Sequence, residues 1–448
     1  MKKALLTIAL LGTAAVGAQA QWLRVWQAGE STRYALSEVS AMPYATAGST
    51  LTVGEDEYAT SEIDSLTIVN PITVTWTADG ASVDIPESVE GVTARIDGGR
   101  VIIDNVNTWA EQELILKGEG KGAITYNGDY KCKVHLSGLT LESDTVAALD
   151  IECGKRVDLI LEDGTVNALS DGTGGNQKAA LYCRGHLEVS GSGSLTLQGN
   201  SKHALSSKEY LQLKKDVGTI TITGAASDGI HVGEYFQMNG GTLALSGLTG
   251  DGIQVETDAK SDEELNGQFI MNGGSIQVTM STADTKGIRL DLDSLDLTIV
   301  PQMNLLGGTI DVTMEKTATD SKGIISDGDM TIGTSAEGPV ITVNMNAVGY
   351  LDANKEKIRS TGIKVGKSDD DGEYGETGDF LMQGGNVVIN ATGHYSRGMN
   401  MNNFTATGGS IAVVASLTGK SIQGIKYSGS TSGEGYVKMT NCDWKRPE

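Results

Sequence analysis

An alternation of apolar and polar residues recurs along most of the chain and predicts many short strands. From residue 149 onward each alternating segment contains a two-residue step, usually Gly-Ile or Ala-Leu. The apolar residue of the step recurs at Leu149, Leu181, Leu205, Ile230, Ile253, Ile288, Ile324, Ile363, Met399 and Ile425. The separations are 32, 24, 25, 23, 35, 36, 39, 36 and 26 residues. Because a period of two is typical of half-buried strands, the spacing indicates one repeated unit with insertions in its longer copies.

A second anchor inside most units is a Gly-Gly pair followed by another alternating strand. The pairs stand at 240–241, 273–274, 307–308, 384–385 and 408–409. Glycine supplies the positive φ that a sharp corner needs. A unit of this size cannot bury its apolar face alone, but stacked units share a continuous core. The pattern therefore predicts an all-β fold, a right-handed parallel β-helix, with the hand taken from the usual rule for crossover connections.

Two features of the repeat predict where side chains and loops lie. The protein has only four phenylalanines, each five residues before the second glycine of a pair, and Met303 takes this place in another unit. This column predicts a stack inside the helix; its phenylalanines are Phe236, Phe269, Phe380 and Phe404. The longer units gain about ten residues at one place in the coil, at 256–268, 291–304 and 366–378. We therefore expect the insertions to follow one edge of the stack.

The two ends of the chain differ from the repeat. Residues 1–20 combine two lysines, an apolar run and a small-x-small ending, which predicts a signal peptide cleaved near Ala20 and a secreted, periplasmic or cell-surface protein. Residues 21–75 predict a small N-terminal β-rich module, and 76–448 the β-helix, with 76–147 as a cap and irregular first coils. No later apolar run is long enough to predict a membrane span.

Composition narrows the possible partners. The net charge is −23, which disfavours nucleic acid and anionic lipid as ligands. Aromatic residues make up 5% of the chain, so a binding surface built from stacked aromatics is not expected. The spacing of the four cysteines fits no zinc motif, and three of them alternate with apolar residues, which predicts buried thiols with one disulfide possible.

The residue after each Gly-Ile step predicts a polar column on the outside of the helix. Alternation places this residue opposite the buried isoleucine, and Ile325 is the exception to its polarity. The members of this polar column are His231, Gln254, Arg289, Lys364, Asn400 and Lys426.

Acidic residues raise the question of a metal ion. Asp228 and Asp251 stand two residues before the repeated isoleucine in successive units, so they are expected to face outward about 4.8 Å apart. Such neighbours repel unless a cation or proton lies between them, and Lys286 of the next unit is an alternative partner. Clustered carboxylates suit Ca²⁺, although solvated acidic loops are the plainer interpretation. The predicted calcium ligands are Asp228, Asp251, Asp258, Asp262, Glu263, Asp291 and Asp293.

Long stretches of the chain from about residue 72 onward resemble a known family. They are LDIECGKRVDLILEDGTVNALSDGTGGNQKAALYCRGHLEVSGSGSLTLQGNSKHALSSKEYLQLKK, SDGIHVGEYFQMNGGT and GDGIQV. The chain is similar there to secreted carbohydrate-binding domain-containing proteins with a pectate-lyase-like right-handed β-helix. The resemblance implies binding of a polysaccharide, plant or acidic, and calcium along the helix. The family's Asp-Gly-Ile is present at Asp228 and Asp251, whereas later units have Lys, Thr, Arg or Gln there.

Three functions remain open at this point. The first, which the resemblance implies, is a non-catalytic polysaccharide-binding β-helix, probed by retention on glycans. Its predicted carbohydrate-binding residues are Arg289, Lys364 and Lys426, which would pair with uronate carboxylates, and His231, Gln254 and Asn400, which would hydrogen-bond sugar hydroxyls. The second is a calcium-dependent polysaccharide lyase, in which Arg289 or Lys286 would act as base beside calcium. The third is a structural adhesin or surface spacer with a partner on the cell surface. Because one fold supports many functions, the β-helix by itself does not decide among them.

Overall fold

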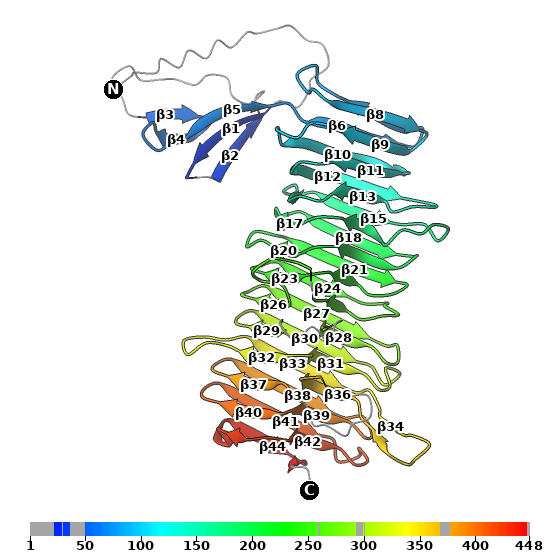
Figure 1. Cartoon of the computed structure of the whole chain (residues 1–448), viewed down its shortest axis with the longest axis vertical. Coiled ribbons are helices and arrows are strands. Elements are labelled where there is room, and N and C mark those ends of the chain that lie inside the picture. The colour runs from blue at the N-terminus through cyan, green and yellow to red at the C-terminus, as the bar shows by residue number, and fades with distance from the viewer. Residues whose placement is uncertain are drawn as a thin grey trace. The chain divides into compact units, whose positions relative to one another are not determined.

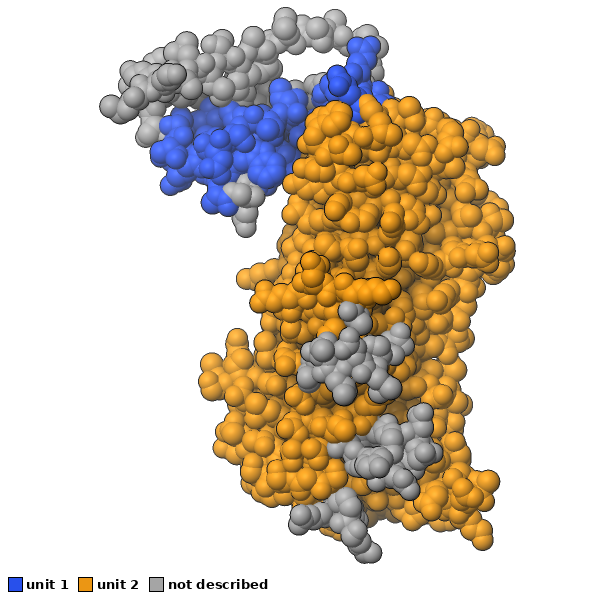
Figure 2. All heavy atoms as spheres, in the orientation of Figure 1, with its two compact units in different colours: residues 1–72, 85–90 blue, residues 73–84, 91–448 orange. Residues whose placement is uncertain are grey.

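The computed structural model describes residues 22–28, 30–35, 50–258, 260–292, 299, 301–367 and 377–445. The chain divides into two compact units, one of Met1–Ile72 with Ile85–Glu90 and the other of Thr73–Asp84 with Gly91–Glu448 (Figure 2). The predicted signal peptide and Asp293 lie outside the described residues. No helix in these described ranges is both long and apolar enough to cross a membrane.

The first unit is a small antiparallel β module. Its three-stranded sheet contains β1 (Trp22–Gln27), β2 (Glu30–Ala35) and β5 (Ser65–Val69), with β1 in the centre. A hairpin joins β3 (Thr50–Val53) and β4 (Asp56–Ala59). The core of the unit is made of Leu23, Val25, Leu51, Val53 and Tyr58, of which Leu51 and Val53 alternate with more exposed positions on β3.

The second unit is a parallel β-helix, seen in Figure 1 as strands stacked from β10 to β44. Each coil contributes one strand to each of three parallel ladders. The first ladder contains β10 (Gln112–Lys121), β12 (Cys132–Glu142), β14 (Val157–Leu161), β17 (Leu187–Ser190), β20 (Leu211–Leu213), β23 (Tyr235–Met238), β26 (Gln268–Met271), β29 (Gln302–Leu305), β32 (Asp329–Ile332), β37 (Asp379–Met382), β40 (Asn403–Ala406) and β43 (Thr431–Ser432). The second ladder continues from the ends of β10 and β12 through β15 (Val166–Ser170), β18 (Ser194–Gly199), β21 (Thr219–Ala225), β24 (Thr242–Leu245), β27 (Ser275–Met280), β30 (Thr309–Met314), β33 (Val340–Met345), β38 (Asn386–Ala391), β41 (Ser410–Ala415) and β44 (Val437–Thr440).

The third ladder carries the Gly-Ile steps of the later coils. It contains β9 (Arg100–Asn105), β11 (Ala123–Gly128), β13 (Leu149–Cys153), β16 (Ala179–Cys183), β19 (His203–Ser207), β22 (Ile230–Val232), β25 (Ile253–Val255), β28 (Lys286–Leu290), β31 (Lys322–Ser326), β36 (Thr361–Val365), β39 (Arg397–Met401), β42 (Gln423–Tyr427) and β45 (Trp444–Lys445). The predicted parallel β-helix is confirmed by this strand order; its right-handed sense stays a prediction.

Antiparallel strands precede the regular coils. The hairpin of β6 (Ile72–Thr77) and β7 (Gly80–Asp84) pairs with β10, and β8 (Val92–Asp97) pairs antiparallel with β9. Two further elements interrupt later coils, the hairpin of β34 (Tyr350–Leu351) and β35 (Lys357–Ile358) and a 3₁₀ turn, η1 (Glu434–Tyr436). Atypical strands at the start of a solenoid cover the edge of the first coil, which would otherwise expose unpaired backbone groups.

The inside of the helix matches the predicted column of phenylalanines. The rings of Phe236 and Phe269 stack with centroids 4.8 Å apart, and those of Phe380 and Phe404 with centroids 5.4 Å apart. Met303 pairs in register with Phe269, and Met330 of the following coil pairs with Met303 on one side and Phe380 on the other. All six side chains are at most 1% exposed, so the column is part of the core.

Glycine is required at two positions of the repeat for different physical reasons. The second glycine of each Gly-Gly pair adopts a left-handed conformation, with φ of 79° at Gly241 and 87° at Gly385, as predicted. The glycine of the Gly-Ile step does not. A Cβ on Gly252 would lie 2.2 Å from the carbonyl oxygen of Gly287 in the next coil. Glycine is needed there because the backbones of successive coils approach closely.

The loops and thiols also follow the sequence expectations. The three long insertions all connect the third ladder to the first, between β25 and β26, β28 and β29, and β36 and β37. Cys132, Cys153 and Cys183 are buried, and all four cysteines are free thiols. The disulfide that the sequence left open does not form.

Candidate functional site

The outward positions of the third ladder form one continuous column. Strand register joins the predicted residues coil by coil and extends the column upstream through Asp150, Tyr182 and Ser206. We call this set the outward column; its members are Asp150, Tyr182, Ser206, His231, Gln254, Arg289, Ile325, Lys364, Asn400 and Lys426. The same step after Leu149, Leu181 and Leu205 in the sequence would have found the three upstream members.

Two adjoining cavities open over the upstream part of the outward column. One has a volume of about 270 Å³ and includes Asp150 and Glu152 in its lining. The other, of about 240 Å³, includes Ser206 and His231. Both cavities are lined by Lys178 and Tyr182, so we treat them as one feature, the twin cavity.

Three lysines line the twin cavity. Lys178, Lys202 and Lys208 line it and are exposed, although the protein as a whole is strongly acidic. Lys178 Nζ lies 3.2 Å from the Tyr182 hydroxyl oxygen and 4.8 Å from the centroid of its ring. Lys178 and Lys202 each directly precede a strand of the third ladder, β16 and β19, so they occupy equivalent places in successive coils. The sequence contains this alignment, because Lys178 and Lys202 each stand three residues before the repeated leucine, Leu181 or Leu205.

Burial changes the protonation chemistry of the cavity floor. Burial, and then the neighbouring Glu152 carboxylate, raise the pKa of Asp150 to about 6, against the lowering influence of Lys178 and Arg100. Burial also raises the pKa of Tyr182 to about 12, so its hydroxyl stays protonated near neutral pH. The floor therefore offers a phenol and a carboxyl group that titrates in the mildly acidic range.

The Asp-Gly-Ile aspartates are placed differently from the prediction. Asp228 and Asp251 were expected to face outward, but each side chain is buried, with 6% of the residue exposed. Asp228 Oδ1 accepts the backbone N–H of Asp251 at 2.8 Å, and Asp251 Oδ1 accepts that of Lys286 at 2.8 Å. Each carboxylate thus satisfies a backbone donor of the next coil, which period-two alternation could not reveal because these residues lie at the start of the strand.

The second oxygen of Asp228 faces two histidines. Asp228 Oδ2 lies 3.2 Å from Nδ1 of His203 and 3.2 Å from Nδ1 of His231. The two imidazole rings stack with centroids 4.3 Å apart at an interplanar angle of 14°. Burial opposes ionisation of Asp228, but the two imidazoles and the N–H of Asp251 hold its pKa well below the usual range. His203 was not predicted as a site residue.

The next part of the outward column is an ion-pair network. Arg289 lies 2.8 Å from Asp291 Oδ2 and 3.5 Å from Asp251 Oδ2. Gln254 donates to Asp291 at 3.3 Å and to Glu256 at 3.3 Å. The guanidinium and amide groups predicted to contact sugar are therefore already engaged with carboxylates of their own chain.

The downstream part of the outward column is less uniform than predicted. Lys364 and Lys426 are half-buried and follow the register as expected. Asn400 is only 4% exposed, so its placement on an open surface was wrong. Ile325 is 6% exposed and interrupts the polar column between Arg289 and Lys364.

The predicted calcium ligands do not come together as one site. Asp258 Oδ1 accepts the N–H of Lys260 at 2.9 Å, while its own backbone exchanges hydrogen bonds with the side chain of Asn266. Asp262 is exposed, and Glu263 lies 3.7 Å from Nε2 of His186. Asp258, Asp262 and Glu263 all lie in the insertion between β25 and β26, whereas Asp291 belongs to the ion-pair network.

The pair Asp228 and Asp251 does not fit the calcium site expected between them. Ca²⁺ takes six to eight oxygen ligands. Two of the four carboxylate oxygens accept backbone N–H groups, one faces the His203 and His231 imidazoles, and one faces the Arg289 guanidinium. Two imidazoles and a guanidinium are unsuitable neighbours for a hard cation that requires oxygen.

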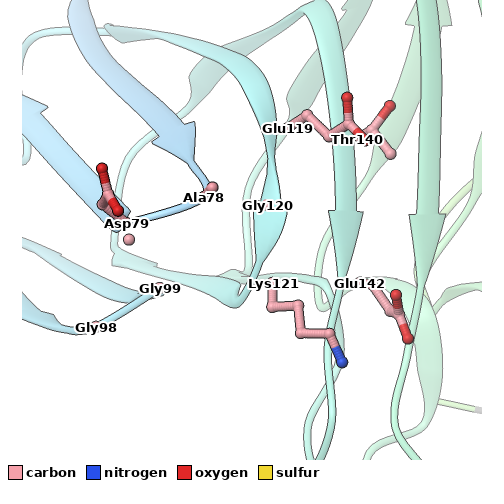
Figure 3. Close-up of a pocket in the computed structure, with 10 residues that line it drawn as sticks. Ala78, Asp79, Gly98, Gly99, Glu119, Gly120, Lys121, Thr140 and Glu142 are labelled. Atoms are coloured by element: carbon pink, nitrogen blue, oxygen red, sulfur yellow. The ribbon is translucent and has the colours of Figure 1, made fainter.

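A larger cavity lies elsewhere, beside the antiparallel strands that precede the coils. It has a volume of about 690 Å³ and is lined by turns rich in glycine and by a few charged side chains. Figure 3 shows Asp79, Glu119 and Glu142 spread around this cavity rather than converging on a point. Binding sites combine concavity with convergent polar groups, which favours the twin cavity despite its smaller volume.

Comparison with known proteins identifies the family of the chain. A family described as carbohydrate-binding domain-containing protein matches residues 97–365, more than half of the sequence, and the chain belongs to this family. One similar solved structure is a polysaccharide lyase-like protein from C. thermocellum, with 18% sequence identity, a TM-score of 0.46 and coverage of 58% of this chain and 96% of the other. No curated protein matches the chain.

Proposed function

We propose that the protein binds an acidic polysaccharide in the twin cavity and along the outward column. The observation that carries this proposal is the convergence of three exposed lysines, Lys178, Lys202 and Lys208, on a cavity of a protein with a net charge of −23. Membership of a carbohydrate-binding family supports a glycan as ligand. Ammonium groups at the rim favour a polymer that carries carboxylates, such as a polyuronate.

The floor of the cavity suits the hydroxyl groups of a sugar. Asp150, Glu152 and Glu256 supply carboxylate acceptors, and Tyr182 and His231 supply a phenol and an imidazole. Carboxylates accept hydrogen bonds from hydroxyls, while the phenol and imidazole donate or accept according to protonation state. Recognition would rest on polar groups in a partly enclosed space, as in other small-molecule sites.

The length of the outward column favours a polymer as the ligand. From Tyr182 to Lys426 it spans eight coil-to-coil steps, which at about 4.8 Å per step is ~38 Å. A linear glycan anchored in the twin cavity can therefore extend along successive coils. Lys364 and Lys426 are the two ammonium groups that the column offers downstream.

Calorimetric titration with polygalacturonate and with an uncharged glucan tests the function. We expect binding of the polyuronate that weakens as salt rises, because exposed charge pairs are screened. Lys178→Ala should weaken binding about fivefold, the loss of one charge pair of about 1 kcal/mol, whereas Lys316→Ala, a change to an exposed lysine after β30, should leave it unchanged. Absence of binding to any anionic or neutral polysaccharide would refute the proposal.

The remaining expectations from the sequence stay predictions with their own measurements. Lyase activity predicts unsaturated products, detected by ultraviolet absorbance, when the protein is mixed with polygalacturonate and calcium. Calcium binding at Asp258, Asp262 and Glu263 predicts a calorimetric signal that their alanine substitutions remove. A role as an adhesin or surface spacer predicts a protein partner without glycan binding. Export predicts a mature N-terminus near Gln21, which mass spectrometry measures.

A further inference from the structure

A compact cluster of nitrogen and oxygen ligand atoms lies beside the twin cavity. His203 begins β19, Asp228 precedes β22 in the next coil, and His231 lies within β22. One ligand atom of each residue lies within 4.8 Å of the ligand atoms of the other two. Among the described residues, this is the only group of three or more His, Cys, Asp or Glu side chains that meets this condition. The parallel coils bring the three together although His203 and Asp228 are 25 residues apart in sequence.

His203 has an unusual environment for a buried polar side chain. It is 2% exposed, and neither of its ring nitrogens has a hydrogen-bond partner among the described residues. Its Nδ1 lies 3.2 Å from Asp228 Oδ2, close enough for electrostatic attraction but outside hydrogen-bond geometry. Buried polar atoms almost always have a partner, so this imidazole indicates a missing ligand.

The carboxylate is held so that one oxygen faces both imidazoles. Asp228 Oδ1 is occupied by the backbone N–H of Asp251 at 2.8 Å, which fixes the carboxylate and directs Oδ2 toward His203 and His231. Ligands of a tetrahedral metal at about 2.0–2.1 Å lie ~3.3 Å from one another. The two N···O separations of 3.2 Å are close to that spacing. Because the two imidazole rings stack at an interplanar angle of 14°, one ring turns out of the stack when both Nδ1 lone pairs point at one ion.

We propose that His203, Asp228 and His231 form a binding site for a divalent transition metal such as Zn²⁺, with the two Nδ1 atoms and Asp228 Oδ2 as ligands. Imidazole and carboxylate suit zinc, whereas calcium takes oxygen alone. Three protein ligands leave a fourth position for water or for an oxygen of a bound molecule. The 240 Å³ cavity, which His203 and His231 both line, provides the approach to that position.

A further observation supports this assignment. On the far side of His231, Nε2 lies 3.6 Å from Glu256 Oε1. A carboxylate beside the second ring nitrogen of a ligand histidine orients the ring and raises its basicity, and such neighbours commonly change metal affinity 10- to 100-fold.

Calorimetric titration of the folded, chelator-treated full-length protein with Zn²⁺ alone tests the site. We expect one tightly bound Zn²⁺ per chain that millimolar Ca²⁺ does not displace. His231→Gln and Asp228→Asn should each weaken it by at least about tenfold, because each removes or neutralises a ligand. Failure to bind Zn²⁺, or equal affinity in the wild type and both variants, would overturn the inference.

The matched control is His186→Gln. The His186 ring also stacks on an aromatic neighbour, with its centroid 4.4 Å from that of Tyr210, and its Nε2 also meets a carboxylate, Glu209 Oε2, at 2.7 Å. It has no second imidazole of the cluster beside it, so Zn²⁺ affinity should be unchanged. A loss as large as that in His231→Gln would contradict the assignment.

Nitrogen NMR of the imidazoles tests the site in the wild-type protein and avoids any folding defect of a variant. The chain has five histidines. Stoichiometric Zn²⁺ should shift the Nδ1 resonances of two of them, assigned to His203 and His231, and leave the other three in place. Shifts of neither would overturn the proposal. Neither experiment contains a glycan, so the metal site stands or fails independently of polysaccharide binding.

Discussion

The early coils, β13 to β25, and the later coils, β28 to β42, share an interior but differ at the start of the third-ladder strand. In the early coils, buried Asp228 and Asp251 accept backbone N–H groups from the following coil. In the later coils, Ser321 Oγ accepts the N–H of Thr285 at 3.0 Å and Ser360 Oγ accepts that of Ser321 at 3.2 Å. The carboxylates thus accept N–H groups of the following coil, and the hydroxyls accept N–H groups of the preceding coil one position earlier in the repeat.

The two solutions have different consequences for function. A buried ionised carboxylate requires further polar partners, and here these are His203 and His231 for Asp228 and Arg289 for Asp251. A buried serine needs no counter-charge. The early coils therefore carry the histidine–aspartate cluster and the twin cavity, while the corresponding acceptors in the later coils are uncharged hydroxyls.

The largest expected effect tests the shared interior. Ile253→Ala in an early coil and Ile363→Ala in a later coil each remove a side chain that is fully buried. Each should lower the free energy of unfolding by about 2–5 kcal/mol, and by similar amounts, because the cost comes from lost packing and a cavity. Urea denaturation followed by circular dichroism measures both. A loss in only one region would show that the interiors are not equivalent.

The next effect tests the difference at the start of the strand. Asp251→Ala leaves the buried N–H of Lys286 without its acceptor and removes one partner of Arg289, so it should cost about 3 kcal/mol. Ser360→Ala removes the acceptor of the Ser321 N–H and the hydroxyl that donates to the Val348 carbonyl oxygen at 3.1 Å, with no charge involved, and should cost about 1–2 kcal/mol. Chemical denaturation of both variants gives the comparison.

Asp251→Asn serves as the control for that comparison. Its amide oxygen can still accept the N–H of Lys286, but its charge is lost, so an intermediate loss of stability is expected. If Asp251→Ala were no more destabilising than Ser360→Ala, the charge of the early coils would have no structural cost or benefit.

A smaller effect is the pH dependence of glycan binding in the early coils. Because its pKa is raised to about 6, the Asp150 carboxyl is neutral below that pH and ionised above it. Added negative charge repels a polyuronate, so affinity should fall about fivefold between pH 5 and 7.5 if the repulsion costs about 1 kcal/mol. Titration calorimetry at both pH values measures this change. In Asp150→Asn the two affinities should differ much less, and an unchanged pH profile would exclude Asp150 as the cause.

The smallest effect concerns the later coils. The double substitution Lys364→Ala and Lys426→Ala removes the downstream ammonium groups of the outward column. It should weaken binding of a long polyuronate by a few-fold and leave a short oligosaccharide unaffected, because only a long chain reaches these coils from the twin cavity. Competition binding with ligands of two lengths measures the difference. Equal losses for both would place the main site downstream.

The repeat made the fold predictable from the sequence. Alternation and the Gly-Gly pairs located the strands and corners, and the phenylalanine column was assigned to the core because its spacing from Gly-Gly is constant. The outward column was also found, because register in a parallel β-helix follows the repeat. Its three upstream members, Asp150, Tyr182 and Ser206, follow Ala-Leu steps, whereas the predicted column began with the first Gly-Ile step, at Ile230.

The site was less predictable because it depends on contacts between unlike positions of neighbouring coils. The burial of Asp228 and the approach of His203 to it follow from the packing of turns, which have no periodicity. Lys208 follows a strand whereas Lys178 and Lys202 precede one, so no single column of the repeat contains all three lysines. The partners of Arg289 likewise come from two other coil positions.

The most direct test of the central claim is the polyuronate affinity of a variant with Lys178, Lys202 and Lys208 all changed to alanine. It should be compared with a variant in which three exposed lysines outside the twin cavity and its strands, Lys117, Lys316 and Lys438, are changed in the same way. The two variants have the same net charge. The account predicts loss of at least about a hundredfold in the first, from three charge pairs of about 1 kcal/mol each, and little change in the second. Equal losses in the two would contradict a site in the twin cavity.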